Sequence, residues 1–139
     1  MATLYLASSA VLTWLLGETN ARQVRTRVDS ATAIVTSVST LLETDRTLIR
    51  AEEQGIIKAA QRQKLKGLLR RAQAAWILME ITGEVRQLAA KPFPVEPVRT
   101  LDAIHLSTAM LFSRAYPDLT VLNFDHRITS NLEPLGLDL

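Results

Sequence analysis

Short apolar runs alternate along the chain with longer segments in which apolar residues recur at helical spacing. Residues 3–6 suit a buried strand, and Ser8 or Ser9 can cap a helix that continues to Leu16 and stops near Gly17. A second helix is predicted over residues 18–29. The β-branched run "TAIVTS", residues 32–37, predicts a second strand.

The middle of the chain reads as a helical hairpin. Apolar positions recur at helical spacing from residue 38 until Gly55 closes the segment, and residues 58–75 form a basic stretch interleaved with leucines. The run "WILMEI", residues 76–81, fits either the end of the second helix or a third strand. We favour the strand, because the next segment, "TGEVRQLAAK", begins with a capping residue.

The last third predicts a long helix and a final strand. Three prolines between residues 92 and 97 indicate an irregular connection, after which residues 99–115 have the apolar pattern of a core-packed helix. A turn, a strand over residues 120–124, a short helix and an apolar end follow. This alternation predicts an α/β fold, with a central parallel sheet of about four to five strands flanked by helices. We expect a single domain over residues 1–139.

Composition narrows the possible chemistry. The 139 residues suit one core, and no run reaches the roughly 18 apolar residues of a membrane span. Because the N-terminus also lacks the pattern of a signal peptide, we expect a cytoplasmic protein. Cysteine is absent, which excludes disulfides, thiolate zinc sites and a cysteine nucleophile. With only two histidines, a histidine-rich metal site is excluded too. Any metal ion would be held mainly by carboxylates.

Charge is unevenly distributed, although the net charge is only +2. Between Glu53 and Glu80 every charged residue is basic. Such a run suits contact with a phosphate backbone or an acidic partner, and it equally suits a solvated helix face. The candidate RNA-binding residues are Lys58, Arg62, Lys64, Lys66, Arg70 and Arg71.

In open parallel sheets ligands bind beyond the carboxyl ends of the strands, which directs attention to the residues that follow each predicted strand. Asp125 directly follows the last strand, where it can also serve as a helix N-cap. Asp102 lies in the first turn of a helix that Thr100 would cap, a position that the helix dipole favours for a carboxylate. His105, three residues on, either orients that carboxylate or satisfies a partner in the core.

Glu43 is a third acid, one turn into the helix after the second strand. Alone it fits a surface position, so the case for a site depends on the three acids converging. Carboxylates brought together repel one another, and a divalent cation removes that cost. Mg²⁺ prefers oxygen ligands and can activate a bound water while neutralising charge on a phosphoryl group. The acids therefore point to the chemistry of metal-dependent nucleases.

Four segments in this order resemble a PIN-domain protein over nearly the whole chain: "LYLASSAVLTWLL", "VTSVSTLLETDRTL", "RTLDAIHLSTAMLF" and "VLNFDHRI...LGL". In length and pattern they are most similar to the VapC-type toxins of bacterial toxin–antitoxin pairs. The segment "LDAIHLSTA" is the most specific. The resemblance implies an Mg²⁺- or Mn²⁺-dependent endoribonuclease that forms a homodimer and is silenced by an antitoxin covering the acidic groove.

The resemblance also implies roles for particular residues. Glu43, Asp102 and Asp125 match three of the family's four acids, and Ser9 matches the small hydroxyl that often supports the first acid. The first acid itself is missing, because Ala7 stands where the family has an aspartate. Changes even in the outer shell of a metal site cost about 10- to 100-fold in metal affinity or activity. The chain as it stands is therefore predicted to be nearly or wholly inactive.

Ala7 has two explanations. One is a deliberate replacement of aspartate, made so that a toxic nuclease could be produced, and it predicts that the rest of the site is intact. The other is a natural PIN-like module that binds RNA or an antitoxin without cutting. A nucleotide-binding α/β protein is disfavoured, because the sequence lacks a glycine-rich phosphate loop.

Overall fold

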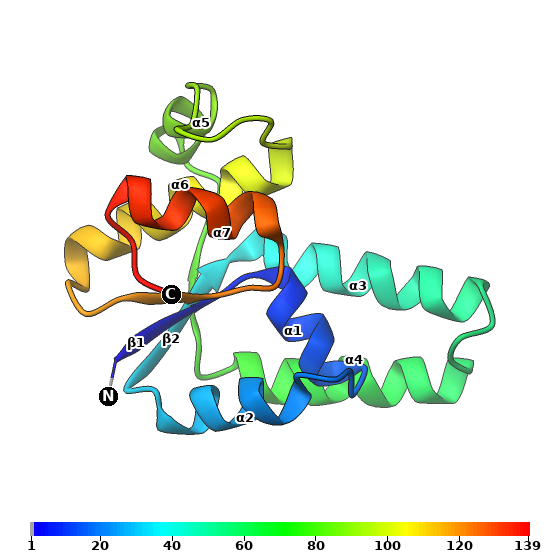
Figure 1. Ribbon diagram of the computed structural model, residues 1–139. Helices are drawn as coiled ribbons and strands as arrows, with labels where there is room; N and C mark the ends of the chain where they lie inside the picture. Colours follow the sequence, from blue (N-terminus) through cyan, green and yellow to red (C-terminus); the bar gives the residue numbers. More distant parts are fainter. Residues whose placement is uncertain (1) are drawn as a thin grey trace.

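The computed structural model describes residues 2–139 and contains a four-stranded parallel sheet covered by helices on both faces (Figure 1). All strand pairs are parallel, and the spatial order is β3-β2-β1-β4. The α/β fold predicted from the sequence is thereby confirmed. The strands are β1 (Thr3–Leu6), β2 (Ala33–Ser37), β3 (Ile77–Met79) and β4 (Thr120–Leu122).

The order of the strands decides where a site is expected. Strand β1 is central and pairs with β2 on one side and β4 on the other. The chain runs outward from β1 to β2 and β3, and later returns to place β4 beside β1. The direction of winding thus reverses between β1 and β4, and open α/β sheets bind ligands beyond the carboxyl ends of the strands at such a point.

The helices lie close to the predicted positions. Arg99, and not Thr100, is the N-cap of α6, and the last strand ends at Leu122 instead of residue 124. Within residues 2–139 no helix is long and apolar enough to cross a membrane. The helices are α1 (Ser8–Leu15), α2 (Ala21–Ser30), α3 (Val38–Glu53), α4 (Ala59–Gln73), α5 (Gly83–Ala89), α6 (Thr100–Ala115) and α7 (His126–Leu132), followed by the 3-10 turn η1 (Glu133–Leu135).

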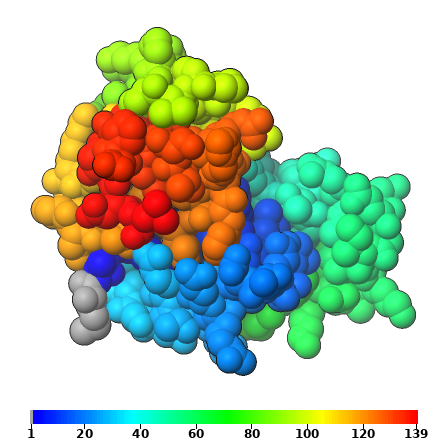
Figure 2. All heavy atoms as spheres, in the orientation of Figure 1, coloured from blue at the N-terminus to red at the C-terminus, as the bar shows by residue number. Residues whose placement is uncertain are grey.

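Helices α3 and α4 form the predicted hairpin, which projects to one side of the molecule (Figure 1; the projection is also visible in Figure 2). Leu48 of α3 and Leu65 of α4 are buried in its interior. Gly55, in the connection, has a positive φ of 74° that favours glycine, so it closes α3 where the sequence predicted.

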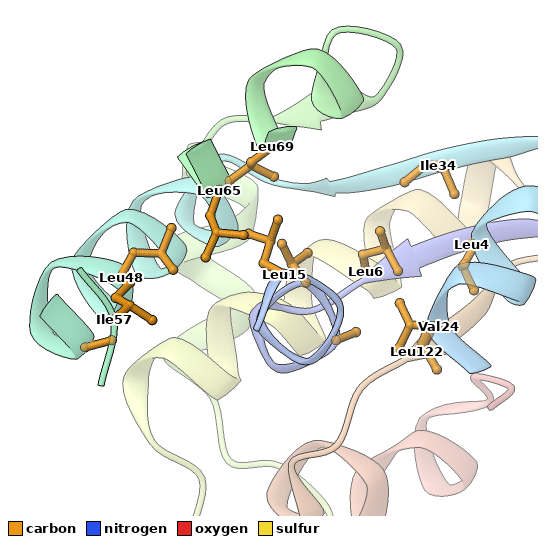
Figure 3. Close-up of a cluster of buried hydrophobic side chains, with 13 residues drawn as sticks. Leu4, Leu6, Leu15, Val24, Ile34, Leu48, Ile57, Leu65, Leu69 and Leu122 are labelled. Atoms are coloured by element: carbon orange, nitrogen blue, oxygen red, sulfur yellow. The ribbon is translucent and has the colours of Figure 1, made fainter. Parts of the chain in front are cut away.

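Two hydrophobic clusters lie on opposite faces of the sheet, because successive side chains of a strand point to opposite faces. On β1, Leu4 and Leu6 join the cluster that contains α1 and the hairpin, as Figure 3 shows. Tyr5, and Ala7 just beyond the strand, join the other cluster, together with residues of α6 and α7. Ala7 is thus held between the sheet and the helix that carries Asp102.

Candidate active site

A groove of about 790 Å³ lies at the carboxyl edge of the sheet, and residues that follow all four strands line it. Ser8 and Ser9 come after β1, Ser39 after β2, Ile81 after β3 and Asp125 after β4. This is the place that the strand order predicts for a ligand site.

The three predicted acids, Glu43, Asp102 and Asp125, all line this groove from different elements. Glu43 reaches it from α3, which begins directly after β2 because Ser37 Oγ accepts a hydrogen bond from the backbone N–H of Ser39 at 3.1 Å. Asp102 lies in the first turn of α6, and Asp125 is the N-cap of α7. Acids that are up to 82 positions apart in the chain (125 − 43) therefore share one groove.

Ala7 occupies the junction between β1 and α1 and is only 1% exposed. It is the N-cap of α1, with extended backbone angles, and its carbonyl accepts the first bond of the helix, from Ala10 N–H. Its methyl group makes no capping hydrogen bond. Aspartate, asparagine and serine are preferred at such a position and alanine is among the poorest residues there. Local structure therefore favours a polar side chain at position 7, beside the acid-lined groove.

Glu43 is held by hydrogen bonds to both carboxylate oxygens. Ser8 Oγ donates to Oε2 at 3.0 Å, and the His105 Nε2 atom lies 2.8 Å from Oε1. The other ring nitrogen of His105, Nδ1, lies 2.8 Å from the hydroxyl of Tyr5, which is fully buried. A continuous chain of hydrogen bonds thus joins the interior of the sheet to a carboxylate in the groove.

The chemistry of Tyr5 and Glu43 together gives the direction of these bonds. Burial raises the pKa of the Tyr5 hydroxyl well above its ordinary value, and the nearby charge of Glu43 raises it further. The hydroxyl therefore stays protonated. The Glu43 carboxylate can only accept, so Nε2 of His105 carries the proton of that bond, and in a ring with one proton Nδ1 accepts from the Tyr5 hydroxyl. Of the two roles that the sequence left open for His105, orienting Asp102 or satisfying a partner in the core, the structure shows the second, with Tyr5 as the core partner, and it adds a contact with Glu43.

Arg99 joins the other two acids. Its Nε donates to Asp102 Oδ2 at 3.2 Å, and its Nη2 donates to Asp125 Oδ2 at 3.0 Å. Hydrogen bonding to Asp102, and then the charges of the two acids, raise the pKa of the guanidinium group, which is always charged in any case. The Arg99 side chain remains 62% exposed, so this bridge lies at the mouth of the groove.

The residues as they stand do not fit a resident metal ion. Within the part of the chain that the structure describes, no group of three acid, histidine or cysteine side chains is placed to hold one. Glu43 is hydrogen-bonded to Ser8 and His105, and Arg99 pairs with the other two carboxylates. The Mg²⁺ or Mn²⁺ expected from the resemblance therefore lacks a ready set of ligands when residue 7 is alanine.

Of the remaining predicted residues, Ser9 lines the groove and the six basic residues do not. The Ser9 hydroxyl accepts a hydrogen bond from Phe124 N–H at 2.8 Å, which ties the start of α1 to the segment after β4. None of the six basic residues from Lys58 to Arg71 lines the groove. Two of them pair with acids of α3, Arg62 with Glu52 and Lys66 with Asp45. Their role in RNA binding stays a prediction.

Sequence reasoning missed Arg99 and Tyr5. A signal for Arg99 was present, because it lies three residues before Asp102, a spacing that allows an ion pair at the start of a helix. Its second partner, Asp125, comes from a distant part of the chain and leaves no local signal. Tyr5 was read only as part of a buried strand, and its pairing with His105 depends on how β1 packs on α6.

The parallel sheet and the acid-lined groove at its carboxyl edge define a PIN-like α/β protein. A model of the PIN domain matches residues 4–130, so the chain belongs to the PIN-domain family. Comparison with curated proteins gives no match.

Two solved structures have a similar fold. One is VapC20 of Mycobacterium tuberculosis, a toxin that cleaves the sarcin-ricin loop, with a TM-score of 0.65 and 14% identity over 91% of this chain and 93% of that chain. The other is VapBC2 of Rickettsia felis, bound to a DNA fragment from its promoter, with a TM-score of 0.58 and 12% identity over 88% of this chain and 99% of that chain. At these identities the likeness establishes a common fold.

Proposed function

We propose that this protein is an endoribonuclease of the VapC toxin type whose activity requires an aspartate at position 7. In that form it would depend on Mg²⁺ or Mn²⁺, and with Ala7 it is largely inactive. The observation that carries the proposal is the convergence of Glu43, Asp102 and Asp125 on one groove beside an N-cap that lacks a polar side chain.

The comparisons support this proposal at the level of family and fold. The chain belongs to the PIN-domain family, and one neighbour in fold is a toxin that cleaves the sarcin-ricin loop. By the same likeness we propose that the protein acts in the cytoplasm, forms a homodimer and is neutralised by a cognate antitoxin. The acids Glu43, Asp102 and Asp125, with Ser9 in support and aspartate at position 7, would form the catalytic centre.

The direct test is Ala7→Asp, assayed for RNA cleavage with added Mg²⁺ or Mn²⁺. A residue that binds the metal directly is worth at least as much as the more distant residues around a metal site, so cleavage should rise by at least about 10- to 100-fold. Ala7→Asn is the matched control. It offers the same helix cap and nearly the same volume without the charge, so it should leave RNA intact.

Absence of cleavage in a folded Ala7→Asp protein would contradict the nuclease proposal. It would favour the second candidate, a PIN-like module that binds RNA or an antitoxin without cutting. One observation favours that candidate: Arg99 pairs with both Asp102 and Asp125, which lowers the repulsion between these two acids without a metal ion. Equal cleavage by the Asn and Asp variants would show that the helix cap, and not a metal ligand, limits activity.

A further inference from the structure

Two arginines of α3, Arg46 and Arg50, line the same groove as the acids. They lie three and seven residues after Glu43, so all three side chains share the groove face of the helix. Both arginines are exposed, and within residues 2–139 neither has a carboxylate within 4.0 Å. Unpaired guanidinium groups on one face of a groove are suited to bind anionic oxygens.

Within residues 2–139, Arg46 and Arg50 differ from the other charged residues of the groove in having no acidic or basic side chain as a partner. The third arginine that lines the groove, Arg99, forms ion pairs with Asp102 and Asp125. Glu43 is bonded to Ser8 and His105. The cations of the groove that have no carboxylate partner among the described residues therefore lie along α3, beginning one turn from Glu43 and extending about 10 Å from it at 1.5 Å per residue.

The basic helix α4 lacks this placement. Its cations stand outside the groove, and two of them are already paired with acids of α3. In the sequence, α4 was the candidate for RNA binding because of its charge alone. In the fold, α3 is the better candidate, because its arginines line the groove.

Apolar side chains on the groove walls suggest what else the ligand presents. Leu42 of α3 is 64% exposed, Leu101 of α6 is 45% exposed and Ile81, after β3, is 37% exposed, and all three line the groove. Large exposed apolar side chains beside unpaired cations suit a polymer that carries phosphates on one side and bases on the other. A single strand can offer unstacked bases to such a wall, whereas a duplex keeps its bases paired.

We infer that Arg46 and Arg50 form the phosphate-binding track for single-stranded RNA, with the bases directed toward Leu42 and Leu101. This inference rests on the proposed function, because it names the residues that bring RNA to the acids. The RNA lies along α3 in the groove, and α4 is not part of its path.

The test is the affinity of the unaltered Ala7 chain and two double variants for a fluorescein-labelled, unstructured RNA, measured by anisotropy at several salt concentrations in EDTA. Arg46→Ala with Arg50→Ala should weaken binding at least about 10-fold and lower the salt slope by about 1.4, since each phosphate contact on a single strand contributes about 0.7. The matched control is Arg70→Ala with Arg71→Ala, which removes the same charge from exposed positions of α4 and should leave affinity and slope nearly unchanged.

The outcomes separate this inference from the proposed function. Loss of binding in the α4 variant alone, or no RNA binding by the unaltered chain, would overturn the phosphate track. An equal loss in both variants would also overturn it, because it would mean a general effect of charge. If the α3 variant alone loses binding while Ala7→Asp still fails to cleave, the track stands and the nuclease proposal falls. Circular dichroism of each variant verifies that it is folded.

Discussion

At the scale of single residues, the contact between Tyr5 and His105 links the core to the groove. The Tyr5 side chain is completely buried, and its hydroxyl satisfies a histidine that is itself only 2% exposed. His105 in turn fixes one oxygen of Glu43, whose side chain is 19% exposed. Tyr5 and His105 therefore act as positioning residues, because they orient an acid that faces the groove.

Replacing Tyr5 should change how stability depends on pH. The raised pKa of Tyr5 means that the folded protein keeps the proton where the unfolded chain loses it, above about pH 10. The native state then binds more protons than the unfolded state, so the free energy of unfolding falls as pH rises through this range. Tyr5→Phe should show a shallower fall, and at neutral pH it should be less stable by about 1 kcal/mol because Nδ1 loses its donor.

Urea unfolding at a series of alkaline pH values measures this difference. Tyr116→Phe is the control, because it removes a hydroxyl from a half-buried tyrosine away from His105. It should retain the decline of the unaltered protein. Parallel declines for the unaltered protein and Tyr5→Phe would mean that another group causes the alkaline loss.

At the scale of elements, hydrophobic pattern predicted the strands and helices, and side-chain hydrogen bonds moved their ends. The last strand stops at Leu122 because Asn123 Oδ1 accepts from Asp125 N–H at 2.9 Å and turns the chain toward α7. The N-cap of helix α6 is Arg99, one residue before the expected cap Thr100, because the Asp102 carboxylate accepts from Arg99 N–H at 3.2 Å. Such bonds depend on single polar groups, so the pattern of apolar positions cannot predict them.

The candidate site was predictable only in part, for the same reason. The strand order and the rule of the carboxyl edge bring Glu43, Asp102 and Asp125 together, and both follow from the alternation of elements. The partners of these acids do not follow from it. Arg99 reaches Asp125 across 26 positions, and His105 reaches Glu43 across 62, so these contacts exist only once the layers have packed.

The α3–α4 hairpin should depend on its buried leucines. Leu69 is 3% exposed, and Leu69→Ala should lower the free energy of unfolding by about 2–5 kcal/mol through lost burial and a cavity. Leu42→Ala, at a position that is 64% exposed, is the matched control and should cost less than about 0.5 kcal/mol. Denaturant unfolding measures both, and similar losses at the two positions would show that Leu42 is covered in solution.

At the scale of the whole molecule, one sheet serves two cores. Adjacent residues of β1 belong to opposite clusters, so neither cluster is complete without the same strand. Both tryptophans, Trp14 and Trp76, pack against the cluster on the side of α1 and the hairpin. The opposite cluster has no tryptophan of its own.

A destabilising change on the side without tryptophan tests whether the chain is a single domain. Leu106 of α6 is fully buried there, and Leu106→Ala should cost about 2–5 kcal/mol. Because the two cores share the sheet, tryptophan fluorescence and far-ultraviolet circular dichroism should shift together to the same lower midpoint. A fluorescence transition that keeps its original midpoint would mean that the two sides of the sheet unfold independently.

The end of the chain has a consequence for handling the protein. Strand β4 lies at an edge of the sheet, and Asp138 pairs with it: the Val121 N–H donates to the Asp138 carbonyl at 2.8 Å, beside a bridge between Thr120 and Asp138. Open strand edges are templates for pairing with other molecules. A truncation that removes residues 137–139 would uncover this edge and promote aggregation, so affinity tags should leave the C-terminal residues in place.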